Sequence, residues 1–65
     1  MIEITIEPAM DMTTKEWRYY YEIEAHGVRV ISNKRYKTSS VAFVQARLWC
    51  SKHGITLDDS TRYLL

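Results

Sequence analysis

The sequence predicts an α+β domain in which a three-stranded antiparallel sheet is packed on one face by a single α-helix, with a short C-terminal tail. Three observations support this: strict alternation of apolar and polar residues in residues 1–7, a two-residue turn at His26 and Gly27, and small apolar residues at helical spacing in residues 40–53. The chain has 65 residues, so we expect residues 1–65 to form a single small domain.

The first strand is predicted over "MIEITIE". Ile2, Ile4 and Ile6 alternate with polar residues, so one face of the strand is buried and the other meets solvent. Pro8 has no backbone N–H to donate and is expected to end the strand. The polar segment that follows, residues 8–16, is predicted to be a loop.

The second and third strands are predicted over residues 17–25 and 28–36. Gly27 readily takes a positive φ and His26 stands where Asn is common, which is typical of a tight hairpin turn. A two-residue turn fixes the register, although a slip or bulge beyond Ser32 would change the outer pairs. From the turn outwards, the expected pairs are Ala25–Val28, Glu24–Arg29, Ile23–Val30, Tyr21–Ser32 and Trp17–Tyr36.

A helix is predicted over residues 40–53, with Ser39 or Ser40 as the N-cap and Gly54 just past the end. At about 100° per residue, one arc of this helix is apolar and has two alanines at its centre, which allow a close approach to the sheet. The residues of this core arc are Ala42, Phe43, Ala46, Trp49 and Cys50.

A second apolar stripe lies on the far side of the predicted helix. It consists of Val41, Val44 and Leu48, called the helix stripe below. Either residues 55–65 cover it, as a short helix or as an extended tail, or it is a contact surface for another protein.

Charge is unevenly distributed along the chain. Residues 1–24 carry six acidic and two basic side chains, a net charge of −4, whereas residues 28–52 carry six basic side chains and no acidic one. The remainder has Asp58 and Asp59 against Arg62, which brings the whole chain to +1. Such asymmetry either marks a binding surface or disappears when folding mixes the two halves.

The sequence favours nucleic-acid binding through the sheet face turned away from the helix. Arg and Asn pair with base edges, Lys contacts phosphates and Tyr stacks on bases, and the choice between DNA and RNA stays open. Glu22 and Glu24 lie on the same predicted face and would repel phosphates, and Arg29 could simply pair with Glu24. The predicted nucleic-acid-binding residues are Arg18, Tyr20, Arg29, Asn33, Lys34, Arg35 and Lys37.

The alternative is a protein-binding or inhibitory module of the phage- or host-regulator type, or a homodimer, using a sheet edge or the helix stripe. The first ten residues lack the basic start and apolar run of a signal peptide, and no stretch approaches the roughly 20 apolar residues of a membrane span. The single cysteine rules out an intrachain disulfide and suits a reducing compartment. We therefore expect a cytoplasmic protein without membrane contact.

The residues predict no enzyme, no cofactor and no metal site. Cys50 falls on the core arc, where it is expected to be an inert buried thiol. His26, His53 and Cys50 lack the paired spacing of metal ligands. Two glycines so far apart form no phosphate-binding loop.

The segment from residue 19 to residue 49 resembles the YegP-like family, a small bacterial family of unknown function whose unit is a β-hairpin followed by a helix. The turn is one residue shorter here, the helix glycine of the family is replaced and its tandem copy is absent. The element order also resembles the DNA-binding domains of tyrosine recombinases that bind arm sites, and the plant ethylene-response-type domains. The residues that carry the YegP-like resemblance are "YYYEIEA", Gly27, Tyr36, Ala42, Ala46 and Trp49.

Overall fold

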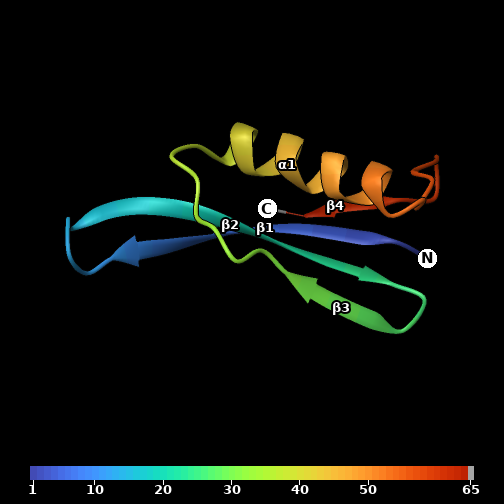
Figure 1. Ribbon diagram of the computed structural model, residues 1–65, viewed down its shortest axis with the longest axis horizontal. Helices are drawn as coiled ribbons and strands as arrows, with labels where there is room; N and C mark the ends of the chain where they lie inside the picture. Colours follow the sequence, from blue (N-terminus) through green and yellow to red (C-terminus); the bar gives the residue numbers. More distant parts are fainter. Residues whose placement is uncertain (65) are drawn as a thin grey trace.

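The computed structural model describes residues 1–64 and contains one helix and one sheet. The strands lie in the order β3-β2-β1-β4, and α1 lies across one face of them (Figure 1). Strands β1, β2 and β3 are antiparallel, and β4 is parallel to β1. The α+β class with one helix is confirmed, but the sheet is mixed and has a fourth strand. The elements are β1 (Glu3–Asp11), β2 (Glu16–Ala25), β3 (Val28–Ile31), α1 (Ser39–Lys52) and β4 (Arg62–Leu64).

Strand β1 runs past its proline, so the predictions that Pro8 ends the strand and that residues 8–16 form a loop are wrong. Pro8 lies opposite Tyr19. The backbone N–H and C=O of Tyr19 both bond to Tyr36 on the other side, at 2.8 and 2.7 Å, so the Pro8–Tyr19 pair exchanges no hydrogen bonds. The backbone nitrogen of Pro8 therefore faces the free edge of β1 beyond the end of β4. Its lack of an N–H group removes no hydrogen bond from the sheet.

The turn between β2 and β3 has the expected form. His26 and Gly27 both have positive φ, 54° and 79°. The four pairs nearest the turn have the predicted register, and the Ser32 N–H still bonds to the Tyr21 carbonyl at 2.9 Å.

Beyond Ser32 the register shifts. The Ser32 side chain accepts the Tyr21 N–H at 3.2 Å and donates to the Lys34 carbonyl at 2.9 Å, so the chain bulges there. As a result β3 ends at Ile31 and Tyr36 pairs with Tyr19. The predictions of a strand to residue 36 and of a Trp17–Tyr36 pair are wrong.

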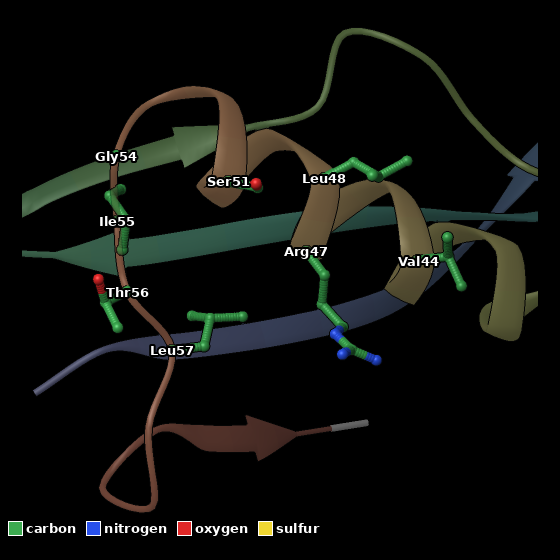
Figure 2. Close-up of a pocket in the computed structure, with 8 residues that line it drawn as sticks. All are labelled: Val44, Arg47, Leu48, Ser51, Gly54, Ile55, Thr56 and Leu57. Carbon is green, nitrogen blue, oxygen red and sulfur yellow. The ribbon is translucent and has the colours of Figure 1, made fainter.

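Helix α1 begins one residue earlier than predicted because its N-cap is Thr38, whose hydroxyl accepts the Val41 N–H at 3.1 Å. The assignment of the cap to Ser39 or Ser40 is therefore wrong. At the other end the chain turns at Gly54, with φ of 69°, and residues 54–57 pass from the end of the helix across the sheet towards β4 (Figure 2). The tail is extended and ends in β4.

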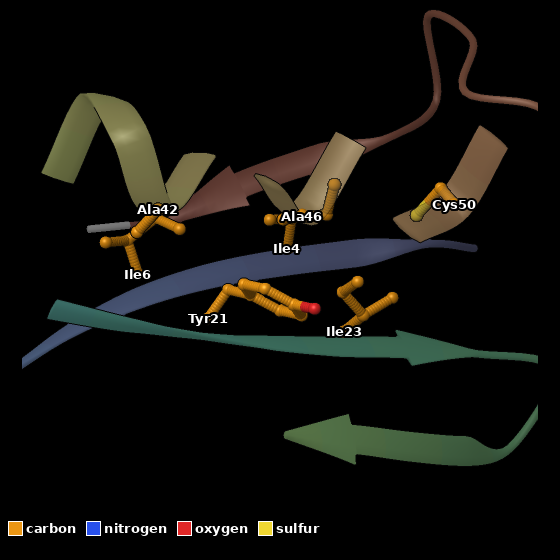
Figure 3. Close-up of a cluster of buried hydrophobic side chains, with 7 residues drawn as sticks. All are labelled: Ile4, Ile6, Tyr21, Ile23, Ala42, Ala46 and Cys50. Atoms are coloured by element: carbon orange, nitrogen blue, oxygen red, sulfur yellow. The ribbon is translucent and has the colours of Figure 1, made fainter. Parts of the chain in front are cut away.

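The core lies between α1 and the sheet, as the core arc predicts (Figure 3). Phe43 and Trp49 flank it and are partly buried. No helix within residues 1–64 is long and apolar enough to cross a membrane. The side chains of the core cluster are those of Ile4, Ile6, Tyr21 and Ile23 from the sheet and of Ala42, Ala46 and Cys50 from the helix.

The β1–β2 hairpin extends beyond the helix (Figure 1). The ten residues of β2 span about 33 Å, whereas the fourteen residues of α1 span about 21 Å. One helix therefore cannot cover the whole hairpin. Residues 9–18, called the arm below, form the uncovered end, and the molecule measures 36 × 19 × 19 Å.

Candidate interaction surfaces

The outer face of the sheet is acidic. Alternate residues of each strand point away from α1, and Tyr63 stacks on Phe43 of the helix, which directs its two neighbours in β4 outwards. The outer face thus carries six acidic side chains and three arginines. The acids are Glu3, Glu7, Asp11, Glu16, Glu22 and Glu24, and the arginines are Arg18, Arg29 and Arg62.

Arg29, predicted to contact bases, lies in a hollow of about 300 Å³ with acidic walls. Its Nε is 2.9 Å from Glu22 Oε1, and its Nη2 is 3.4 Å from Glu24 Oε2. These two ion pairs hold the guanidinium against β2. Arg29 therefore pairs with Glu24, as the alternative from the sequence expects, and also with Glu22.

Two other residues of the predicted nucleic-acid site also have acidic neighbours. Arg18 Nη2 lies 3.4 Å from Glu16 Oε2. The Tyr20 hydroxyl donates a hydrogen bond to Glu7, and this bond raises the pKa of Tyr20. Arg18, Tyr20 and Arg29 are thus all engaged with carboxylates of the sheet.

The remaining four predicted residues lie in the loop between β3 and α1. Asn33, Lys34, Arg35 and Lys37 are exposed, and none of the three cations forms an ion pair within residues 1–64. The structure brings Asn33 and Arg35 together with Tyr20 around a hollow of about 430 Å³, whereas Lys34 and Lys37 do not line it.

This hollow lies near the acidic end of the sheet. The backbone N–H groups of Thr13 and Thr14 lower the pKa of Asp11, and the positive charges of Arg18 and Arg35 lower it further. The charge of Arg35 therefore acts on Asp11 without an ion pair between them. A phosphate placed there would meet both signs of charge.

An open groove of about 670 Å³ runs between α1 and the returning tail (Figure 2). The Ile55 N–H bonds to the Cys50 carbonyl at 2.9 Å, which turns the chain at the helix end so that residues 55–57 cross the sheet beside it. We call it the helix groove. Its lining residues are Val44, Arg47, Leu48 and Ser51 from α1 and Gly54, Ile55, Thr56 and Leu57 from the tail.

The tail flanks the helix stripe without covering it. Val41, Val44 and Leu48 remain 44%, 52% and 51% exposed. Residues 55–64 therefore do not provide the cover that the sequence offers as one alternative, and Leu65 lies outside the described residues. Stripe and tail instead form the two walls of a groove, and the sequence signal for the second wall is the apolar "ITL" directly after Gly54.

The helix groove carries positive charge. Arg47 lines it, and no acidic residue does. Arg47 forms no ion pair with an acid of residues 1–64. The whole stretch from residue 28 to residue 57 lacks an acid, so the uneven charge of the sequence becomes an acidic outer sheet face and a basic helix side.

The arm carries a second exposed apolar surface, which sequence reasoning missed. Met10 and Trp17 are direct cross-strand neighbours on the sheet side that α1 covers further along. Met10 is 37% exposed, Trp17 59%, and Met12 at the tip 69%. We call these three residues the arm patch. Because Trp17 alternates with core residues along its strand, the sequence pattern predicts that its side chain is buried. It is exposed because α1 is too short to cover the arm.

The residues with nucleophilic or ligating side chains are dispersed or buried. Cys50 is fully buried and burial raises the pKa of its thiol, as expected for an inert core residue. His53 packs against Trp49, with ring centroids 4.0 Å apart. Within residues 1–64 no cluster of three or more His, Cys, Asp or Glu side chains could hold a metal ion.

Comparison of the chain with protein-family models, with curated proteins and with solved structures gives no match. The resemblance to the YegP-like family therefore stays an expectation from the sequence.

Proposed function

We propose that the protein is a small binding module whose helix groove holds a segment of another protein that combines apolar side chains with carboxylates. The observation that carries this proposal is the exposed apolar pair Val44 and Leu48 beside Arg47, in a groove without an acidic residue.

Two physical arguments support a partner of this chemistry. Val44 and Leu48, faced by Ile55 and Leu57, offer apolar surface that gains free energy when water is removed from it. A carboxylate beside Arg47 adds an ion pair and speeds the encounter. A second copy of the same groove would instead bring two basic surfaces together, which disfavours self-pairing at this site.

The test is a fluorescence anisotropy titration with two labelled synthetic peptides. Both contain leucines at helical spacing, and one carries Glu where the other carries Lys. We expect the Glu peptide to bind more tightly. An exposed ion pair contributes up to about 1 kcal/mol, so Arg47→Glu, which replaces attraction by repulsion, should weaken binding about tenfold.

The matched control is Lys34→Glu, which changes the net charge equally in a loop that does not line the groove. It should leave the affinity nearly unchanged. Equal losses from Arg47→Glu and Lys34→Glu would mean that the peptide responds to overall charge. Binding of the Lys peptide as tight as that of the Glu peptide would contradict the proposed partner.

Nucleic-acid binding is the second candidate, and the loop between β3 and α1 supports it. Lys34, Arg35 and Lys37 are exposed cations, and Tyr20 and Asn33 lie beside Arg35. The acidic outer face disfavours a duplex laid flat on the sheet, so contact through this loop is the form we propose. In the same titration a labelled DNA duplex would then bind at low salt and lose affinity steeply as salt increases. No binding at low salt would exclude this candidate.

A further inference from the structure

We propose that the arm is a self-association surface on which a second copy of the chain packs, related by a two-fold axis, so that Trp17 of each copy lies against Met10 of the other. This surface is separate from the helix groove, and the inference does not depend on the proposed function.

The exposed area of the molecule supports a missing contact. A folded monomer of 7.7 kDa is expected to expose about 4,300 Å², and this chain exposes 4790 Å². The excess of about 500 Å² belongs to the whole molecule, and the exposed side chains of Met12 and Trp17 on the arm contribute to it. Trp and Met are also enriched in interfaces relative to other surfaces.

The charge of the arm favours a second copy over a strongly charged partner. Asp11 and Glu16 balance Lys15 and Arg18, so the arm has no net charge. Two arms can therefore meet without the like-charge repulsion that two helix grooves or two outer sheet faces would experience. The arm patch thus combines large apolar side chains with a neutral surround.

The shape of the patch also suits pairing with itself. Met10 and Trp17 lie side by side on neighbouring strands, so a two-fold rotation places each indole ring over a thioether. Flexible Met side chains adapt to an aromatic ring, and contacts between sulfur and the ring are favourable. A lipid surface fits less well, because binding to anionic headgroups needs an excess of basic residues near the apolar side chains.

The first measurement is analytical ultracentrifugation of the full chain over a range of concentrations. We expect a dimer that dissociates on dilution. Because the patch contributes twice to a two-fold dimer, Trp17→Lys and Met12→Lys should each weaken association by about tenfold or more. Leu48→Lys introduces the same charge in the helix groove and should leave the dimer intact.

A second measurement uses the native arm. In the Trp49→Phe variant, Trp17 is the remaining tryptophan, and its emission should shift to shorter wavelength as the concentration rises and the indole leaves water. This readout does not require a lysine in the sheet, so a folding defect of Trp17→Lys cannot decide the result. A monomer at all concentrations, an unchanged emission, or a dimer broken by Leu48→Lys and kept by Met12→Lys would overturn the proposal.

Discussion

Asp58 directs the tail into the sheet. Its carboxylate accepts the Ser60 N–H at 2.9 Å and the Ser60 hydroxyl at 2.6 Å, and these bonds lower its pKa below the ordinary value of 3.8. Thr61, which is buried, closes the turn by accepting the Asp58 N–H at 3.0 Å. The next residue, Arg62, donates its N–H to the Ile2 carbonyl at 2.8 Å and so begins β4. One exposed carboxylate thus helps to place a strand.

We expect Asp58→Ala to lower the thermal midpoint at neutral pH. Because the folded-state pKa is depressed, the carboxylate's contribution is fully present above about pH 3.8 and is lost as pH falls through the lowered pKa. The difference in midpoint between wild type and variant should therefore shrink below that pH. Circular dichroism melts at several pH values measure it, with Asp59→Ala as the neighbouring control. A difference that stays constant down to the acid limit would contradict this role.

At the scale of elements, the sequence predicts those features of the fold that depend on residues close to one another in the chain. Alternation from Ile2 to Ile6, the positive φ of His26 and Gly27, and the arc around Ala46 each act within a few residues, and each is confirmed. The two walls of the helix groove follow similarly from an apolar stripe and the turn at Gly54.

The features that the sequence does not predict depend on distant partners. Pro8 is tolerated in β1 because Tyr19 bonds to Tyr36, 17 residues further on. Strand β4 pairs with the other end of the chain, and its three residues show no periodicity of their own. Exposure of the arm patch depends on where α1 begins over the sheet (Figure 1). The acidic surroundings of the predicted nucleic-acid-binding residues on β2 and β3 have the same origin, since pairing places Glu3 and Glu7 beside β2.

The contact between α1 and the sheet depends on small side chains. Ala42 and Ala46 are fully buried against Ile4, Ile6 and Tyr21. We expect Ala46→Leu to overpack this contact and to reduce the free energy of unfolding by about 1–3 kcal/mol. Urea denaturation measures the change. Val44→Leu, on the exposed side of the helix, should change stability by less than about 0.5 kcal/mol, and a neutral Ala46→Leu would show that the interface is loosely packed.

At the scale of the whole molecule, folding sorts the charges onto two sides. The acidic first third of the sequence forms most of the outer sheet face, and the basic middle forms the β3–α1 loop and the helix side. The sorting has an internal cost, because Glu3 lies directly opposite Glu24, and Asp11 lies opposite Glu16. Arg29 offsets part of it through its two ion pairs. The same sorting leaves the helix groove without an acidic lining residue.

This cost makes the stability of the protein depend on salt. In an Arg62→Gln background, which removes the cation opposite Glu3 in β4, Glu3→Gln removes one of two like charges across the β1–β2 pair, so we expect it to raise the free energy of unfolding by about 0.2–0.5 kcal/mol at low salt. At about 1 M salt the Debye length falls to about 3 Å, so the gain should vanish. Glu7→Gln is the matched control, since Glu7 faces Tyr20 and not an acid, and it should bring no such gain. Urea denaturation of the three proteins at both salt concentrations measures this. A gain for Glu3→Gln that persists at high salt would show that strand propensity, and not repulsion across the acidic face, is its cause.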